Sequence, residues 1–287
     1  MIRNDGRSEH EFRKVEIVYE GLDRVDGSAR FAFGQTESIV SVSGPVEVRP
    51  ASENPSQATL DIFIRPLASL PGTDAKSISN TLKSIFTPAL LLSQHPRTLI
   101  QLVAQALCGS ETGSGTGSAG RGWNSSLIAT LINATTAALV NASSVPMKGT
   151  VCAVAVGTIG EPSTNDRIFV VDPSEVELPS LTSSGCFAFM FSSTLPPQSG
   201  SLKSVVPPSS LIWTNFGSVN GTPFDENDLT HATKLGARAA AEIWLCMKES
   251  LATIEKKPTS VSQAPGESKK AAVKVETESD DEKMEIS

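Results

Sequence analysis

The apolar residues of this chain repeat with two different periods, and this alternation limits the fold more than any other feature of the sequence. Strand-like runs occur within residues 14–49 and over residues 58–65, 97–107, 150–156, 167–171 and 186–192. Helical spacing occurs over residues 74–94, 124–139 and 225–255. Strands interleaved with helices and closed by a long helix indicate an α+β domain, in which antiparallel sheets pack helices on one face.

Turn residues set the expected limits of the strands. Asp26–Gly27 is expected to supply a hairpin turn, and Gly44–Pro45 is expected to end the β-rich run over residues 38–42. Residues 211–214 form a further short candidate strand after a Pro/Ser-rich stretch.

Capping and helix-breaking residues set the limits of the helices. Asp74 and Asn124 are expected to cap the first and second helices, and Pro88 is expected to kink the first helix or to split it. The second helix is expected to bury a single stripe of apolar side chains. These side chains are Leu127, Ile128, Leu131, Ile132, Ala138 and Leu139.

Composition divides the chain into one domain and two tails. Residues 1–13 are polar and are expected to be flexible, and residues 14–255 are expected to form one domain. Loop insertions are expected near residues 109–122, which are Gly/Ser/Thr-rich, and near residues 195–220. Residues 256–287 have almost no large apolar side chains, so we expect a disordered acidic tail.

The overall charge and the cysteines exclude several classes of protein. A net charge of -7 does not suit a surface that grips nucleic acid by broad electrostatics, so any RNA contact must be local or shared with partners. The cysteines lack metal-ligand spacing, which predicts reduced thiols and no metal site. They are Cys108, Cys152, Cys186 and Cys246.

Two further functions are also not expected. No run of apolar residues reaches the roughly 18 needed to span a bilayer, so we expect a soluble protein without a membrane partner. Residues 115–120 match Gly-x-Gly-x-x-Gly, but the surrounding loop is uniformly Gly/Ser/Thr and no acidic residue stands about 20 positions further on. We therefore expect no cofactor.

An ordered set of short motifs resembles the RNase PH-like family. The motifs are Asp-Gly-Ser-Ala-Arg-Phe at 26–31, Gly-Gln-Thr at 34–36, Gly-Pro-Val-Glu-Val at 44–48, Ile-Arg-Pro at 64–66, His-Pro-Arg-Thr-Leu-Ile at 95–100, Leu-Ile-Asn-Ala at 131–134 and Val-Pro-Met at 145–147. Each motif alone is weak, but their order is similar to that of RNase PH-like subunits of the eukaryotic RNA exosome ring, in the half related to bacterial RNase PH.

The resemblance implies a fold, partners and a location. The fold is that of the second domain of ribosomal protein S5, with mixed sheets packed with helices. The partners are other RNase PH-like subunits in a six-membered ring, RNA-binding cap subunits, an associated exoribonuclease and RNA in the channel. The location is the nucleus, the nucleolus and the cytoplasm. The function is then 3′–5′ processing and degradation of RNA, including rRNA maturation.

The residues that carry phosphorolysis in active relatives are expected to be missing here. The resemblance places Leu127 and Ile128 where active relatives hold phosphate with a Thr-Arg or Ser-Arg pair, and it places Asp172 and Leu178 at a pair of carboxylates. Glu177 is adjacent to the second of these positions, and a shifted register would bring it into the pair.

Two basic residues are candidates for contact with RNA. Lys83 is a weak candidate for a second phosphate-holding cation on the first helix, and Arg97 is a candidate for contact with RNA or with a neighbouring subunit. Arg97 is at least as well explained as a residue that orients the connection between helix and strand. Asp172 in turn is also explained as an ordinary turn at the end of a strand.

Three interpretations remain open. The favoured one is a non-catalytic ring subunit. The second is an active phosphate-dependent 3′–5′ exoribonuclease, and the third is an unrelated α+β domain, which explains the periodicity but not the ordered motifs.

Overall fold

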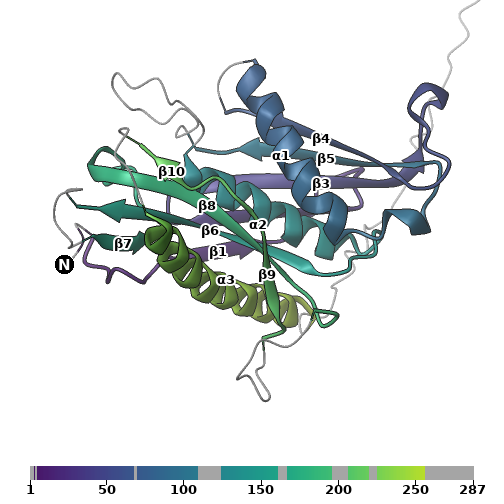
Figure 1. The fold of residues 1–287 in the computed structure, drawn as a ribbon. Helices are drawn as coiled ribbons and strands as arrows, with labels where there is room; N and C mark the ends of the chain where they lie inside the picture. Colours follow the sequence, from purple (N-terminus) through teal and green to yellow (C-terminus); the bar gives the residue numbers. More distant parts are fainter. Residues whose placement is uncertain are drawn as a thin grey trace, which may run out of the picture.

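Two five-stranded sheets and three helices form the body of the molecule (Figure 1). The computed structural model describes residues 3, 5–67, 70–108, 124–160, 167–195, 206–219 and 225–255, and the statements below concern these residues. The strands are β1 (Val15–Val18), β2 (Gly27–Phe33), β3 (Thr36–Glu47), β4 (Thr59–Arg65), β5 (Thr98–Ala106), β6 (Thr150–Ile159), β7 (Ile168–Val171), β8 (Leu181–Phe191), β9 (Ser209–Thr214) and β10 (Gly217–Ser218). The helices are α1 (Thr73–Ala89), α2 (Ser125–Ala142) and α3 (Glu226–Glu255), with short 3₁₀ turns at η1 (Pro50–Ser52), η2 (Leu92–Gln94) and η3 (Leu178–Ser180).

The first sheet has the order β1-β2-β3-β5-β4, and it is mixed because β4 runs parallel to β5. The tight hairpin turn lies at Gly34–Gln35, between β2 and β3, where Gly34 has φ +57°. The turn expected at Asp26–Gly27 is wrong, since Gly27 already begins β2. Its missing side chain lets the backbone of Ala142 approach, because an added Cβ would lie 2.4 Å from Ala142 N.

Strand β3 is longer than the sequence predicts. It passes through Gly44–Pro45 to Glu47, with a bulge between Ser43 and Val46 opposite β5. The expected stop at Gly44–Pro45 is therefore a bulge inside a strand, which is where sheets tolerate proline.

The second sheet has the order β10-β8-β6-β7, and β9 adds to β8. Its strand β8 begins at Leu181, earlier than the expected start at residue 186. Part of the loop expected near residues 195–220 is also ordered, because β9 and β10 pair with β8. The loop expected at residues 109–122 and the tail at 256–287 lie outside the described residues.

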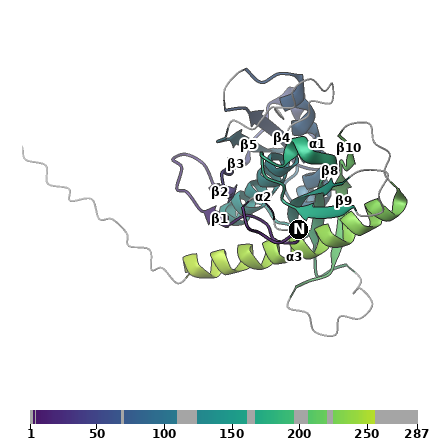
Figure 2. The same ribbon diagram turned by 90° about the vertical axis from the view of Figure 1, so that its left-hand side faces the viewer.

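Helix α2 packs against β2 and β3 of one sheet and against β6 and β8 of the other, while α1 covers β4 and α3 covers β6 (Figures 1 and 2). Residues from Ser126 to Leu139 are all buried, so the expected single stripe is wrong. The reason is that sheets cover this helix from two sides. Among the described helices α2 alone is long and apolar enough to cross a membrane, and 83% of it is buried inside the molecule.

The helix ends agree only in part with the expected caps. Asn124 caps α2 as predicted, since its side chain accepts a hydrogen bond of 3.0 Å from Ser126 N. Gly72, and not Asp74, is the cap of α1, and Asp74 lies in the first turn. Pro88 lies in the last turn of α1, which ends at Ala89. A separate 3₁₀ turn, η2, follows, so the predicted helix over residues 74–94 is split in two.

Polar side chains of α2 complete the free edge of β6. Asn133 Oδ1 accepts from Ala153 N and its Nδ2 donates to Ala153 O, both at 2.8 Å, and Thr136 Oγ1 donates to Val151 O at 2.6 Å. β7 pairs with β6 only from Val156 to Ile159, so these backbone groups have no strand partner. The helix thus satisfies them, as buried backbone groups require.

Candidate functional site

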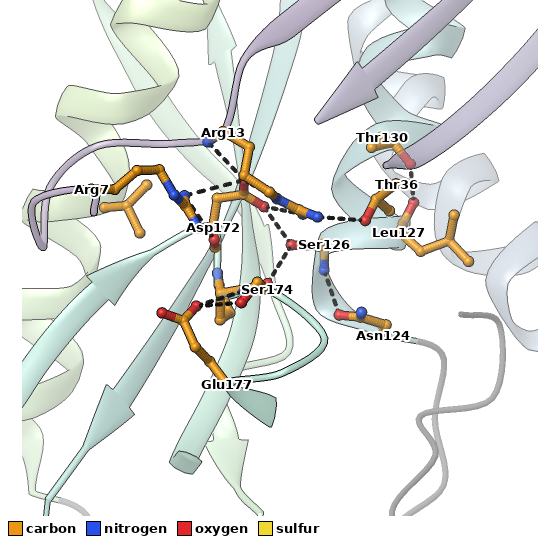
Figure 3. Close-up of polar contacts among 12 residues, drawn as sticks. Arg7, Arg13, Thr36, Asn124, Ser126, Leu127, Thr130, Asp172, Ser174 and Glu177 are labelled. Atoms are coloured by element: carbon orange, nitrogen blue, oxygen red, sulfur yellow. Dashed lines mark hydrogen bonds and ion pairs between the residues drawn. The ribbon is translucent and has the colours of Figure 1, made fainter. Parts of the chain in front are cut away.

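Asp172 is the central residue of the candidate site, and it follows directly after β7. Its backbone N–H donates to Ala155 O at 2.8 Å, which continues the row of contacts along the free edge of β6. Its φ of +47° turns the chain sharply out of the strand. The carboxylate is 0% exposed and lies between the N-terminal segment and the start of α2 (Figure 3).

Arg13 binds this carboxylate with both arms of its guanidinium group. Arg13 Nη2 lies 2.6 Å from Asp172 Oδ1 and Arg13 Nε lies 2.7 Å from Oδ2, while the backbone N of Arg13 donates to Oδ2 at 3.0 Å. Arg13 Nη1 donates to Thr36 Oγ1 at 2.8 Å. Burial by itself lowers the pKa of Arg13, but the hydrogen bonds to Asp172 together with the negative charges of Asp172 and Glu175 outweigh burial and raise the pKa.

Ser126, in the first turn of α2, takes the remaining space at Asp172. Its Oγ donates to Asp172 Oδ1 at 2.6 Å. The guanidinium of Arg7 lies further away, with Nη1 at 3.8 Å from Asp172 Oδ2 (Figure 3). Both carboxylate oxygens therefore already have two donors each, so Asp172 is engaged by the protein itself and is shielded from solvent.

Glu177 forms a second buried ion pair with the N-terminal segment. Arg3 Nε lies 2.7 Å from Glu177 Oε1 and Arg3 Nη2 lies 2.5 Å from Oε2, while the N–H and Oγ of Ser174 donate to Oε2 at 2.7 and 3.0 Å. Burial alone raises the pKa of Glu177, but the bonds from Arg3 and Ser174 outweigh it and lower the pKa to about 2. Glu177 is thus a charged partner of Arg3.

These contacts differ from the flexible N-terminus that we expected. Arg3 is buried, Arg3 Nη1 donates to Val171 O at 2.7 Å, and Val171 N donates to Glu9 O at 2.9 Å. Composition suggested a mobile segment because residues 1–13 are polar. Pairing with carboxylates distant in the sequence instead buries Arg3 and largely buries Arg13.

Leu127 and Ile128, the positions matched to the phosphate-holding pair of active relatives, are buried. Leu127 is fully buried and Ile128 is 6% exposed. The side chain of Leu127 points away from Asp172 (Figure 3). Leu178 is half-buried at the start of η3. The polar side chains of the first turn of α2 itself, Ser125 and Ser126, are uncharged. Ser125 Oγ, for example, lies 3.2 Å from Ser184 Oγ.

The two basic candidates lie elsewhere. Lys83 is on the exposed side of α1, and Arg97 is 70% exposed at the turn before β5, with φ +61° and its Nε 3.3 Å from a carboxylate oxygen of Glu53. No hydrogen bond or ion pair within the described ranges joins either residue to Asp172. Within the same ranges no three His, Cys, Asp or Glu side chains are grouped so as to hold a metal ion.

The sequence did not identify the arginines that complete this cluster. Arg3, Arg7 and Arg13 all lie in the first thirteen residues, but the carboxylate partners of Arg3 and Arg13 are 174 and 159 positions away. The available signal was a cluster of arginines in a chain with a net negative charge. This signal does not specify which carboxylate each arginine binds.

Comparison with known proteins agrees with this architecture. Residues 11–144 match the 3′ exoribonuclease family, domain 1, known as RNase PH. The chain is 30% identical over 175 residues to the protein named exosome complex exonuclease RRP46 homolog from Oryza sativa, covering 61% of this chain and 65% of that protein. It is 37% identical over 86 residues to exosome complex component RRP46 from Saccharomyces cerevisiae, covering 30% of this chain and 39% of that protein.

A solved structure extends the similarity to most of the fold. The crystal structure of rice Rrp46 superimposes with a TM-score of 0.67 at 25% identity, covering 87% of this chain and 100% of that chain. The aligned segments span less than two thirds of the two curated relatives, at 65% and 39% of their lengths. The matched domain, the RRP46-type relatives and the shared fold together show that this chain contains an RNase PH domain, matched over residues 11–144.

Proposed function

We propose that this chain is a non-catalytic subunit of an exosome-type ring, which supports 3′–5′ processing and degradation of RNA, including rRNA maturation, by scaffolding and by lining an RNA channel. Its partners in this proposal are other RNase PH-like subunits in a six-membered ring, RNA-binding cap subunits and an associated exoribonuclease. Its location is the nucleus, the nucleolus and the cytoplasm. The RNase PH domain and the similarity to RRP46-type relatives support the ring assignment.

The state of Asp172 is the observation that carries the non-catalytic part of the proposal. A carboxylate that organises a metal or moves a proton must reach the reacting groups. Asp172 is fully buried and accepts hydrogen bonds on both oxygens from Arg13 and Ser126. In this position it holds the N-terminal segment and α2 together.

Electrostatics at the start of α2 point in the same direction. Attacking phosphate and a scissile phosphodiester are both anions, so bringing them together requires cations that are fixed in place. The loss of one preorganised contact of this kind costs roughly 3 to 4 kcal/mol in the transition state. Leu127 and Ile128 are apolar and buried, so they offer no such contact.

A phosphorolysis assay tests the proposal. The chain would be assembled in a ring whose other subunits are nuclease-dead, and release of nucleoside diphosphates from single-stranded RNA would be followed with phosphate and magnesium. We expect no release above a ring-free blank, while an archaeal exosome core assayed in parallel provides the positive control.

The alternative is an active phosphorolytic 3′–5′ exoribonuclease, and the printed name of the rice relative includes the word exonuclease. Diphosphate release that is lost in Asp172→Asn would favour this alternative. Because Asp172 also holds the fold together, native mass spectrometry must show the variant in an intact ring before the loss counts against our proposal.

A further inference from the structure

A small cavity lies between helices α2 and α3, the end of strand β1 and the start of strand β6. Its volume is about 160 Å³, and its walls are mostly apolar. An engineered apolar cavity of about 150 Å³ in another protein binds benzene, so this cavity suits an apolar group of about six carbon atoms. It is separate from the cluster around Asp172, because the two share no residue. The lining residues are Tyr19, Thr136, Ala137, Val140, Thr150, Trp244, Met247, Lys248 and Leu251.

Lys248 is the one charged residue among those that line the cavity. Its ammonium nitrogen lies 5.3 Å from the centroid of the Trp244 ring, so a cation–π contact holds the charge in place. The side chain is exposed, and it has no ion-pair partner within the described residues. A positioned, unpaired cation beside an apolar cavity is complementary to an apolar group that carries a negative charge.

Thr150 adds a neutral hydrogen-bond donor to the same cavity. Trp244 Nε1 donates to Thr150 Oγ1 at 3.0 Å, so the hydroxyl oxygen is the acceptor in that bond and the hydroxyl keeps its own proton for donation. Among the described residues this proton has no acceptor. A carboxylate bound here can therefore meet an ammonium group and a hydroxyl group, and hydrogen bonds to an ionised group are the stronger kind.

We infer that this cavity binds the C-terminal residue of a partner protein, with a leucine-like side chain inside the cavity and the α-carboxylate on Lys248. The carboxylate must lie close to the buried group, because Lys248 lines the same small cavity. The α-carboxylate of a C-terminal residue meets this condition, since it is attached to the same Cα atom as the side chain. The side chain of a neighbouring Asp or Glu in an extended segment does not, since neighbouring side chains point to opposite sides. Capture of a terminal carboxylate is a known mode of peptide recognition.

The size of the cavity favours a polypeptide over a free organic acid. A free acid that buries only about six carbon atoms binds in the millimolar range once the entropy lost on binding is included. A polypeptide adds contacts outside the cavity. Leu22, three positions after Tyr19, is 41% exposed and offers apolar surface to the residues that precede the C-terminal one.

Titration calorimetry of the full-length chain with short peptides tests the inference. The probe is acetyl-Ala-Ala-Ala-Leu with a free C-terminal carboxylate, and its dissociation constant should be on the order of 100 μM. The same peptide with a C-terminal amide lacks the negative charge and should bind about tenfold more weakly or worse. A peptide that ends in Ala in place of Leu keeps the carboxylate but loses the buried group, and it should be weakened by about as much.

Variants of the chain locate the binding site. Lys248→Gln removes the charge and should weaken the acid peptide about tenfold while leaving the amide peptide unchanged. Lys234→Gln is the matched control, because Lys234 is exposed on the same helix but does not line the cavity, and it should change neither affinity. Ala137→Leu fills the cavity and should abolish binding of both peptides. Urea denaturation shows whether this variant still folds, and the Lys248 comparison stands without it.

Three outcomes overturn the inference. One is equal affinity, or no measurable affinity, for the acid and amide peptides. Another is an equal effect of Lys248→Gln and Lys234→Gln, which places the contact elsewhere on the molecule. The third is tighter binding of a different probe. If 4-methylpentanoate, the free acid with the same side chain, binds as tightly as the peptide, the cavity belongs to a small organic acid. If acetyl-Ala-Leu-Glu-Ala-amide binds more tightly, the cavity belongs to an internal acidic segment.

Discussion

Two arginines of the N-terminal segment are held by carboxylates that follow β7. Arg3 pairs with Glu177 and Arg13 with Asp172, and all four side chains are largely withdrawn from solvent. Removing one partner of such a pair leaves an uncompensated buried charge, which costs far more than the loss of a surface ion pair. The fold therefore depends on the charge state of these residues.

The Arg3–Glu177 pair predicts a specific dependence of stability on pH. The pKa of Glu177 is lowered from its usual 4.5 to about 2 in the folded state. The stabilisation is therefore fully present above about pH 4.5 and is lost as the pH falls through 2. Glu177→Gln should lower the free energy of unfolding by at most about 3 kcal/mol near pH 6, and by about half of that near pH 3.

Urea denaturation of wild type and variant across this pH range measures the difference. Glu175→Gln is the matched control, because Glu175 is exposed two positions away and its loss should change stability by about 0.5 kcal/mol or less. A Glu177→Gln effect that stays constant from pH 6 to 3 would show lost packing, with no contribution from the charge.

Among the secondary-structure elements, α2 is the helix whose side chains form hydrogen bonds with the backbone at the edge of strand β6. Its neighbouring residues Thr135 and Thr136 are both fully buried, but their hydroxyls have different partners. Thr136 donates to Val151 O of β6, whereas Thr135 donates to Leu131 O in its own helix. This pair separates the contribution of the helix-to-strand bond from that of burying a threonine.

Replacement of each threonine by valine tests this difference. Thr136→Val should lower the free energy of unfolding by about 1–2 kcal/mol, because Val151 O loses its donor in a buried position. Thr135→Val should be close to neutral, since Leu131 O remains within the hydrogen-bond ladder of the helix. Urea denaturation of both variants measures the two values. Equal losses would mean that the bond to β6 adds nothing specific.

Local sequence signals predicted the strands and helices better than they predicted which residues pack against them. The alternation of Val15 and Ile17 and the cap at Asn124 were sufficient to predict β1 and the start of α2. The hairpin turn was assigned to Asp26–Gly27 because that dipeptide has turn chemistry, whereas Gly34 makes the turn. Only the fold reveals why Gly27 is needed, since Ala142 approaches it from the end of α2.

The candidate site was less predictable than the fold, because its contacts join residues that are distant in the sequence. The absence of cationic side chains at Leu127 and Ile128 is a property of single residues, so the sequence displays it directly. The partners of Asp172 come from the N-terminal segment and from α2, and no local pattern specifies contacts over 159 and 46 positions.

For the molecule as a whole, the two ends of the chain are expected to contribute differently to stability. The N-terminal segment joins the two sheets, because Arg13 directly precedes β1 of the first sheet while its partner Asp172 follows β7 of the second. At the other end, the described part of the chain finishes with α3 at Glu255, and the Lys, Glu, Ser and Pro that follow offer little apolar surface to bury.

Truncation of each end should therefore have opposite outcomes. Deletion of residues 1–12 removes Arg3 and leaves Glu177 buried without its partner, so the free energy of unfolding should fall by about 3 kcal/mol or more. Deletion of residues 257–287 should change it by about 0.5 kcal/mol or less, because composition predicts no buried contacts there. Urea denaturation gives both values, and native mass spectrometry of reconstituted complexes shows whether each form still enters a ring. A C-terminal deletion that fails to assemble would mean that the tail contributes to an interface, and an N-terminal deletion of wild-type stability would mean that the buried ion pairs add nothing to the fold.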